Sequence, residues 1–489
     1  MNQTFLAFDL GAESGRGVLA EFDGQKLTLS EAGRFPTTGD AKEPGPDGVW
    51  RWDYREIVSQ IRGILKAAEA DHKLSGVAVD TWGVDFGLID AAGELIEDPA
   101  CYRDASHGAA MDETLGRMSG EDLWAETGIQ LMPFNTLFQV RAIQKRSPDV
   151  LAKAARLLFM PDLLASALVG NPAGASELTI ASTSQMLDPR TQTWNTRLLD
   201  RLGLPYHFLQ PIVKPGATYG TTPGGTVVRA TGGHDTASAV AAVPAIDGKT
   251  WAYISSGTWS LLGIESETPV LGLDAYKMGL SNEIGVRGAT RLLKNIMGLW
   301  LVQECRRSLA RAGREYDYAT LTMLAAGAPP DGPVVDATHH RFLAPADMPT
   351  ELRAACIETG QTPPSGDAEL IRCCLDSLAL AYRRTLHAIE GVVGTKFEVL
   401  HIVGGGTKNL LLNQLAADAC GIPVVAGPGE ATAVGNVLTQ MVGSGAVASW
   451  EEARQVCRNS FDPETFLPNA ATRSEWLARE ESFARATAN

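Results

Sequence analysis

The sequence predicts an α/β protein of two related halves, each a mixed sheet flanked by helices. A strand, a turn of small residues and a second strand occur at residues 4–22, and the same pattern returns at 251–264. In each half, further strand and helix patterns follow this hairpin, an order typical of a mixed sheet covered by helices. Two such turns about 245 residues apart indicate a duplicated domain that holds a nucleotide between its halves, because Gly and Ser let backbone N–H groups approach a phosphate.

Capping and periodicity place the main elements in order. In the first half, Asp53 and Glu56 form a capping box before a helix that carries Ile57, Ile61 and Leu65 on one face. A buried strand follows at 76–80. The second half has a long helix at 368–390, a strand at 398–403 that runs into three glycines, and a strand at 422–426 between helices at 409–420 and 431–442. We therefore expect an N-terminal domain over 1–243, a C-terminal domain over 250–445, and a helical tail over 446–489 packed on the second domain.

Composition limits the class of protein. The chain has 489 residues, 45% of them hydrophobic, which is enough for two cores. A formal net charge of −15 argues against binding to nucleic acid or to an anionic membrane. No apolar run approaches the length of a membrane span and no signal peptide is evident, so we expect a cytoplasmic protein. The seven cysteines lack zinc-type spacing and are expected to be mostly reduced, although a Cys356–Cys373 bridge is an alternative.

The first turn, at 11–17, follows Asp9 at the end of a strand. A carboxylate beside backbone N–H groups that cradle a phosphate suits a Mg²⁺ held through water. The structural alternative is an ordinary glycine hairpin. The second copy of the turn, which includes Thr258, favours the functional interpretation.

Asp235 follows two glycines and His234, and it precedes Thr236 and a run of small residues. It could act as the N-cap of a helix at 236–243. It could equally accept a proton from a substrate hydroxyl, the one base that kinase-type phosphoryl transfer needs. The segment alone leaves both interpretations open.

Other candidate clusters are less specific. The glycines at 404–406 follow a strand and open a helix, which favours a ligand with a flat ring or a phosphate over a simple tight turn. Residues 80–85, 102–104 and 134–136 combine polar side chains with aromatic ones, as polyol sites do, but each is more often structural. His339 and His340 lack partners at ligand spacing, so a zinc site is not expected.

Taken together, these residues resemble the FGGY family of carbohydrate kinases, within the actin-like ATPase superfamily. The resemblance runs from about residue 4 to residue 442. It is carried by these strings: Asp-Leu-Gly-Ala-Glu-Ser-Gly-Arg (9–16), Asp-Thr-Trp-Gly-Val-Asp-Phe (80–86), Tyr-Arg-Asp (102–104), Met-Pro-Phe-Asn-Thr-Leu (132–137), His-Asp-Thr-Ala-Ser-Ala-Val (234–240), Ser-Ser-Gly-Thr-Trp-Ser-Leu (255–261) and Leu-Lys-Asn-Ile-Met-Gly-Leu-Trp (293–300).

The resemblance implies two ribonuclease-H-like domains with a cleft between them, the sugar deep in the cleft and ATP above it. It implies that Asp235 is the catalytic base and that Asp9 helps to place Mg²⁺ through water. By the same resemblance, the ATP-binding residues would be Ala12, Glu13, Ser14, Gly15, Arg16, Thr258, Gln303 and Gly405, and the sugar site would hold Gly83, His234, Asp235, Thr236 and Asn295. Glu13 departs from the small residue of many relatives, and we expect its side chain to point away from the phosphates.

The implied reaction is transfer of a phosphoryl group from ATP to a ketose, with L-rhamnulose phosphorylated at O1 as the first expectation. The strings at 80–86 and 293–300 favour that sugar over L-fuculose or a pentulose. An actin-fold ATP-binding protein without sugar kinase activity is the alternative from another class, and the base at Asp235 and the polar cluster at 80–104 count against it. ATP and a small ketose are the expected ligands, and a monomer or homodimer is the expected state.

Overall fold

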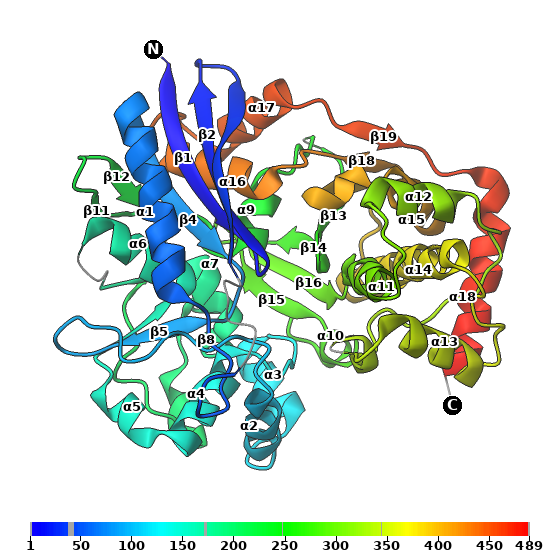
Figure 1. Cartoon of the computed structure of the whole chain (residues 1–489), viewed down its shortest axis with the longest axis horizontal. Coiled ribbons are helices and arrows are strands. Elements are labelled where there is room, and N and C mark those ends of the chain that lie inside the picture. The colour runs from blue at the N-terminus through cyan, green and yellow to red at the C-terminus, as the bar shows by residue number, and fades with distance from the viewer. Residues whose placement is uncertain (1, 38–43, 171–173, 247, 344, 488–489) are drawn as a thin grey trace. The chain divides into compact units, whose positions relative to one another are not determined.

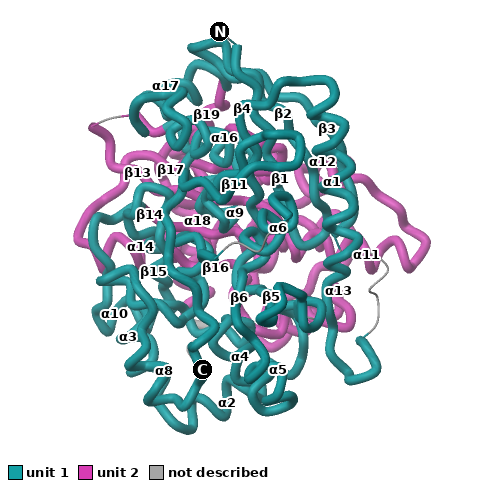
Figure 2. The backbone as a smooth tube through the Cα atoms, turned by 90° about the vertical axis from the view of Figure 1, so that its left-hand side faces the viewer, with its two compact units in different colours: residues 1–244, 265–292, 431–461 teal, residues 245–264, 293–430, 462–489 magenta. Residues whose placement is uncertain are grey.

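The computed structural model describes residues 2–37, 44–170, 174–246, 248–343 and 345–487. Two compact units divide it (Figure 2): unit 1 comprises residues 1–244, 265–292 and 431–461, and unit 2 comprises residues 245–264, 293–430 and 462–489. Both contain a mixed sheet with helices, so the predicted α/β class is confirmed (Figure 1).

The sheet of unit 1 has the strand order β11-β12-β4-β1-β2-β3. β1 pairs antiparallel with β2 and parallel with β4, so the predicted hairpin lies beside the predicted buried strand. The strands of this sheet are β1 (Gln3–Leu10), β2 (Ser14–Phe22), β3 (Leu27–Pro36), β4 (Leu74–Thr81), β11 (Thr218–Thr221) and β12 (Val227–Arg229). Three two-stranded sheets pair β5 (Phe86–Ile89) with β6 (Arg156–Phe159), β7 (Ser176–Glu177) with β10 (Ile212–Val213), and β8 (Leu187–Asp188) with β9 (Thr193–Trp194).

The helices of unit 1 come from both ends of the chain. They are α1 (Tyr54–Asp71), α2 (Ser106–Leu115), α3 (Gly120–Thr127), α4 (Thr136–Arg146), α5 (Pro148–Lys153), α6 (Met160–Val169), α7 (Leu178–Ala181), α8 (Thr196–Leu202), α9 (Asp235–Ala241), α10 (Leu273–Lys277), α16 (Ala431–Ser444) and α17 (Trp450–Ser460), with the 3₁₀ turn η1 (Ser182–Ser184).

The second sheet has the order β15-β16-β14-β13-β17-β18-β19, and the boundary between the units falls within β14 and β16. Its strands are β13 (Trp251–Ser256), β14 (Ser260–Ser266), β15 (Ser281–Ile284), β16 (Thr290–Ile296), β17 (Val399–Val403), β18 (Val424–Ala426) and β19 (Glu464–Phe466). The helices of unit 2 are α11 (Trp300–Arg311), α12 (Tyr318–Ala326), α13 (Met348–Glu358), α14 (Asp367–Val393), α15 (Leu410–Cys420) and α18 (Arg473–Thr487), with the 3₁₀ turns η2 (His340–Phe342), η3 (Gly405–Lys408) and η4 (Ala470–Thr472).

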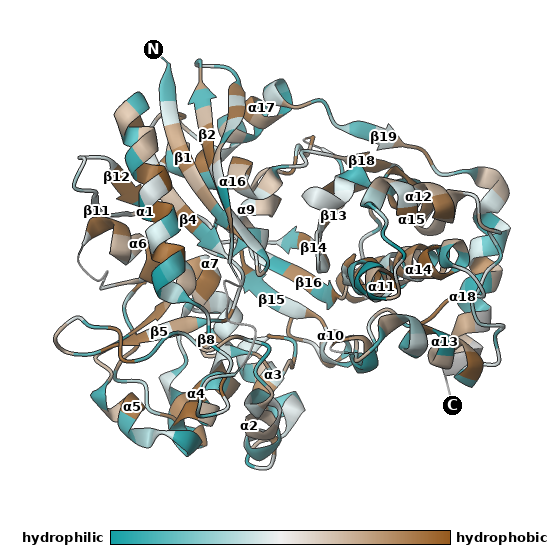
Figure 3. Cartoon of the chain, viewed as in Figure 1, coloured by the Kyte–Doolittle hydropathy of each residue, from teal (hydrophilic) through white to brown (hydrophobic). Residues whose placement is uncertain are grey.

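The helix α1 shows how sequence pattern becomes packing in unit 1. The Asp53 side chain accepts the Glu56 N–H at 3.0 Å, which confirms the predicted start of the helix. Hydrophobic and hydrophilic residues alternate along α1 in Figure 3, and its apolar face is buried. Residues of that face share one core with alternate residues of β1 and with α6; the members from these three elements include Leu6, Phe8, Leu10, Ile57, Ile61, Leu65, Leu163, Leu164 and Leu168.

A helix from late in the chain, α16, donates hydrogen bonds to β1 and β4. In α16, Asn436 Nδ2 donates to Asp80 Oδ2 at 2.6 Å, and Gln440 Nε2 donates to the Leu6 carbonyl at 3.0 Å. Gly435 allows α16 to pack closely against α9, since a Cβ there would lie 1.7 Å from the Ser238 carbonyl oxygen of α9. The helix α16 is therefore part of unit 1.

The compact units thus differ from the linear division expected from the sequence. α17 also belongs to unit 1, where Ser460 Oγ accepts the Leu27 N–H at 2.7 Å and Cys457 Sγ lies 3.1 Å from the Ala242 carbonyl. β19 and α18 belong to unit 2. Side-chain hydrogen bonds that link α16 and α17 to segments more than 200 residues earlier accompany this grouping, and no local pattern reveals them.

All seven cysteines lie in the described ranges, and each is a buried free thiol. Cys356 and Cys373 are therefore not bridged in this structure. Within the described residues, no helix is both long enough and apolar enough to cross a membrane.

Replacing Asn436 by Ala should lower the stability of unit 1, because it leaves the fully buried Asp80 carboxyl without its hydrogen-bond donor. A lost partner of this kind costs about 1–3 kcal/mol. The urea unfolding midpoint of the Asn436→Ala variant should lie at a lower urea concentration than that of the wild type. Asn459→Ala, which removes an exposed hydrogen bond from α17, is the matched control and should change little. Equal midpoints for the two variants would contradict the role given to Asn436.

Candidate active site

The turn between β1 and β2 is closed by an ion pair across the hairpin. Asp9 and Arg16 face each other in the strand register, and Arg16 Nη2 and Nε lie 2.7 and 3.1 Å from Asp9 Oδ2. The Gly11 N–H donates to the Ser14 carbonyl at 3.0 Å. A Cβ at Gly15 would come within 2.6 Å of the Phe35 ring, so only glycine fits there. The predicted phosphate turn is thus a tight hairpin, and Arg16 is held by Asp9.

Residues 12–16 form the strand-end turn that the sequence singled out. The Glu13 carbonyl accepts the Thr37 N–H at 3.3 Å. The outward direction of the Glu13 side chain stays a prediction.

Asp80 lies next to Asp9 on the neighbouring parallel strand. It is completely buried, Asn436 occupies its Oδ2, and its Oδ1 has no partner among the described residues. Burial, and then the charge of Asp9, raise the pKa of Asp80 well above its ordinary value, against the hydrogen bond from Asn436. The protonated form of Asp80 avoids two adjacent negative charges at this sheet edge.

The segment before α9 is fixed by three backbone hydrogen bonds. The Thr81 N–H at the end of β4 donates to the Gly233 carbonyl at 2.9 Å. The Gly233 N–H donates to Glu177 Oε2 at 3.0 Å, and the His234 N–H donates to Thr179 Oγ1 at 3.3 Å. Glu177 is itself buried and also accepts the Thr179 and Ile180 N–H groups. The backbone leading to Asp235 therefore has little freedom.

Asp235 is the first residue of α9, one position inside the helix, and His234 occupies the N-cap. The Asp235 Oδ1 accepts the N–H of Thr236 at 2.6 Å. About 33% of its side chain remains exposed. Even so, partial burial raises the pKa of Asp235; His234 opposes this rise and Asp9 adds to it. The result is a reachable carboxylate with more affinity for a proton than a fully solvated one, as a general base requires.

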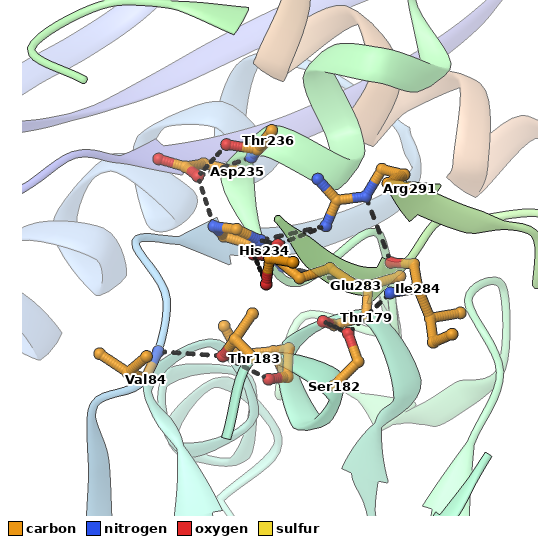
Figure 4. Close-up of polar contacts among 12 residues, drawn as sticks. Val84, Thr179, Ser182, Thr183, His234, Asp235, Thr236, Glu283, Ile284 and Arg291 are labelled. Atoms are coloured by element: carbon orange, nitrogen blue, oxygen red, sulfur yellow. Dashed lines mark hydrogen bonds and ion pairs between the residues drawn. The ribbon is translucent and has the colours of Figure 1, made fainter. Parts of the chain in front are cut away.

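His234 lies between Asp235 and a buried ion pair (Figure 4). Its Nε2 is 3.3 Å from Asp235 Oδ1, and its Nδ1 is 3.1 Å from Glu283 Oε2. Arg291, which is fully buried, donates to the same Glu283 oxygen at 3.0 Å. A Cβ at Gly83 would lie 3.4 Å from His234 Nε2, so the glycine keeps the space beside this ring open. Unit 1 thus brings together Gly83, His234, Asp235 and Thr236, four of the five predicted sugar-site residues.

The Asp85 carboxylate holds two indole rings in place near Gly83. Its Oδ2 accepts the indole N–H groups of Trp52 and Trp82 at 2.6 and 2.9 Å, and its Oδ1 accepts Gln139 Nε2 at 2.8 Å. The two indole centroids are 4.2 Å apart, and Tyr102 lies beside Trp52. Burial raises the pKa of Asp85 to about 6, in spite of these hydrogen bonds.

Val84 has a φ of +70°, which a β-branched residue rarely adopts. Its N–H donates to Thr183 Oγ1 at 3.2 Å, and its carbonyl accepts Thr136 Oγ1 at 2.6 Å. Local strain of this kind is kept where surrounding contacts fix the backbone, often beside a functional site.

In unit 2, the second small-residue turn joins β13 to β14. The Gly257 N–H donates to the Trp259 carbonyl at 2.8 Å, and Gln303 Nε2 donates to Thr258 Oγ1 at 3.3 Å. The Gln303 Oε1 atom is buried without a partner among the described residues, so it can accept an N–H or O–H from a ligand. Thr258 and Gln303 were both predicted at the nucleotide, and unit 2 brings them into contact.

The glycines after β17 allow a close approach of backbone to β13. Gly404 has a φ of +89°, and a Cβ at Gly406 would lie 1.9 Å from Ser256 Oγ. Gly405 begins η3 and has open space where a Cβ would project. Asn295, the fifth predicted sugar-site residue, lies on β16 in unit 2.

Besides Trp52, three charged residues at this site were missed in the sequence: Glu177, Glu283 and Arg291. The available signal was a charged residue inside an otherwise buried strand, since Glu283 lies in β15 and Arg291 in β16, and both strands are largely buried. Such residues are rarely buried unless they are paired. Within the described residues, no group of three or more His, Cys, Asp or Glu side chains could hold a metal ion.

Comparison with known proteins gives a consistent answer. Residues 4–241 match the N-terminal domain of the FGGY family of carbohydrate kinases, and residues 252–444 match its C-terminal domain. A rhamnulokinase of Enterococcus faecalis is 40% identical over 482 residues, which cover 96% of this chain and 94% of the relative. A rhamnulokinase of Bacteroides thetaiotaomicron is 39% identical over 481 residues and 96% of both chains.

Solved structures share the fold at low identity. A gluconate kinase from Lactobacillus acidophilus superposes with a TM-score of 0.80 at 13% identity, over 100% of this chain and 99% of the other. Plasmodium falciparum glycerol kinase with ADP gives a TM-score of 0.79 at 15% identity, over 100% and 98%.

The raised pKa of Asp85 predicts a pH-dependent stability difference between the wild type and Asp85→Asn. Between pH 4 and 6 the folded protein holds a proton on Asp85 that the unfolded chain has lost, so wild-type stability should fall relative to the variant as the pH rises. The difference should reach about 3 kcal/mol and level off above pH 6. Urea unfolding of both proteins at several pH values measures it, and a difference independent of pH would contradict the prediction.

Proposed function

The chain belongs to the FGGY family of carbohydrate kinases, and we propose that it transfers the γ-phosphoryl group of ATP to O1 of L-rhamnulose. The observation that carries the choice of sugar is the identity of about 40%, over 95% or more of the chain, to relatives named rhamnulokinase. Neither a kinase for another ketose nor an actin-fold ATP-binding protein is favoured by these relatives.

The proposed catalytic base is Asp235. Phosphoryl transfer asks little covalent chemistry of a protein beyond orienting the hydroxyl, taking its proton and neutralising charge on the phosphates. Asp235 fits the first two tasks because its backbone is fixed by Thr81, Glu177 and Thr179, while its carboxylate stays reachable and has a raised pKa.

For the sugar, we propose that Gly83, His234, Thr236 and Asn295 bind the hydroxyl groups. The indole rings of Trp52 and Trp82, held by Asp85, supply an apolar wall of the kind that sugar C–H faces pack on.

For the nucleotide, we propose that the turn of residues 12–16 and Thr258 hold the phosphates, while Gln303 and Gly405 contact the rest of ATP. The unpartnered Gln303 Oε1 and the open space at Gly405 support this assignment. Mg²⁺ would be bound chiefly by ATP oxygens, where it would neutralise phosphate charge, with Asp9 holding it through water. One nearby carboxylate fits such a site, because Mg²⁺ keeps most of its waters.

We further propose that the protein is cytoplasmic and works as a monomer or homodimer. The seven buried free thiols support a reducing compartment.

A sugar panel tests the proposed substrate. ADP release with Mg-ATP should be fastest with L-rhamnulose, compared with L-fuculose, L-ribulose, L- and D-xylulose, glycerol and a control without sugar. If another ketose is preferred, the proposed substrate is wrong but the assignment as a sugar kinase stands. ADP release that is independent of every sugar would refute sugar kinase activity.

Asp235→Asn should reduce kcat by about 10²–10⁴, the usual contribution of a general base, with ATP binding retained. Asp274→Asn is the matched control, because Asp274 also lies in the first turn of a helix of unit 1 but is exposed. The control should retain wild-type turnover. Near-normal turnover in Asp235→Asn would show that Asp235 is not the catalytic base.

A further inference from the structure

The imidazole of His234 connects two carboxylates. One ring nitrogen, Nε2, lies 3.3 Å from the proposed base Asp235, and the other, Nδ1, lies 3.1 Å from Glu283. In Figure 4 the ring lies between the two carboxylates, and Arg291 lies close to both the ring and Glu283. Sugar binding alone does not explain why the buried ion pair of Glu283 and Arg291 contacts this histidine.

Glu283 is held as a carboxylate. Burial by itself raises its pKa, but the hydrogen bond with His234 and the charge of Arg291 oppose that effect, and its pKa lies below the ordinary value. Arg291 is permanently charged, is fully buried, and donates to Glu283 Oε2. Together the two residues form a buried pair without net charge.

A carboxylate can only accept hydrogen bonds, so a proton on His234 Nδ1 would turn its 3.1 Å contact with Glu283 Oε2 into a hydrogen bond. Arg291 Nη2 also lies 3.2 Å from Nδ1. Donation from Arg291 to Nδ1 would leave the Glu283 carboxylate facing a nitrogen lone pair, which is repulsive. The Nδ1–H tautomer satisfies Glu283 but leaves the lone pair of Nε2 facing the Asp235 carboxylate at 3.3 Å, which is repulsive as well. That repulsion costs less, because the Asp235 side chain is 33% exposed and can be solvated, whereas the Glu283 side chain is 6% exposed. One proton added between Nε2 and Asp235 removes it.

We propose that His234 takes over from Asp235 the proton that the sugar hydroxyl releases, and that Glu283, held by Arg291, is a positioning residue that fixes the Nδ1–H tautomer. This inference rests on the proposed kinase function. It gives His234 a role in proton transfer in addition to sugar binding.

The step balances as follows. The sugar oxygen forms its bond to the γ-phosphorus while the bond from that phosphorus to the ADP oxygen breaks. The hydroxyl proton moves to Asp235 and then to His234 Nε2, which becomes an imidazolium beside the Asp235 carboxylate that is thereby regenerated. Exchange with water after product release returns the ring to the Nδ1–H tautomer. Because Asp235 holds protons more tightly than a solvated carboxylate, a nearby acceptor regenerates the base for the next turnover.

The first test is the protonation of His234 in the resting enzyme. ¹⁵N NMR of histidine-labelled protein distinguishes the two ring nitrogens, and the signals that vanish in His234→Gln assign this residue among the eight histidines. A proton on Nδ1 and none on Nε2 is the expected result. A proton on Nε2, in either a neutral or a cationic ring, overturns the proposal, since that nitrogen could then accept nothing.

The second test is kinetic. Glu283→Gln should lower kcat by about 10-fold to 100-fold, less than loss of the base itself, with a smaller change in KM for the sugar. The same substitution in a His234→Gln background should cost almost nothing more, because Glu283 acts through that ring. Additive losses would overturn the positioning role.

Glu265→Gln is the matched control. It removes another shielded carboxylate of unit 1, paired with Arg454 at 2.6 Å and without contact to His234, and should leave kcat unchanged. If Glu283→Gln does not fold, Arg291→Lys keeps the charge beside Glu283 and should show the same pattern more weakly. The NMR result needs no sugar, so it separates failure of this proposal from failure of the sugar kinase function, which the sugar panel reports.

Discussion

The site in unit 1 depends on one backbone hydrogen bond, from the Thr81 N–H to the Gly233 carbonyl. It joins the end of β4 to the segment that opens α9. Since β4 also pairs in parallel with β1, the same strand end brings Asp9, Gly83 and Asp235 to one edge of the sheet. Residues separated by more than 200 positions meet there without a long loop, because parallel strands end at a common edge.

Around that edge, unit 1 buries four carboxyl groups in three ways that share one physical requirement. Asp85 and Glu177 are surrounded by hydrogen-bond donors, Glu283 is paired with Arg291, and Asp80 favours its protonated form. A buried charge without such compensation is strongly destabilising. Only Asp235 keeps a substantial exposed fraction, which is the difference that suits it to chemistry rather than to architecture.

Local patterns were enough to predict the hairpins, the start of α1 at Asp53 and the long helix now seen as α14. They also identified the Gly83, His234 and Asp235 segments, because small residues and turns next to polar groups are visible in sequence. Glu177 and Glu283 were not predicted, because the partner of a charged residue in a strand is not visible in the sequence. The placement of α16 escaped for a similar reason: amphipathic periodicity shows that a helix has a buried face, not which sheet covers it.

The reach of α16 has a consequence for how the protein is made. Asp80 and its partner Asn436 are 356 residues apart, a stretch that a ribosome needs about 20 to 70 seconds to synthesise. During that time α16 cannot yet pack on the face of β1 and β4 that it covers in the folded protein. Unit 1 therefore lacks one of its helices until residue 444 has emerged. A nascent chain that ends before residue 431 already carries Asp235 and His234, but on an incompletely covered sheet. Synthesis of residues 431–461, rather than of the segment that carries the proposed base, sets the moment at which unit 1 can mature.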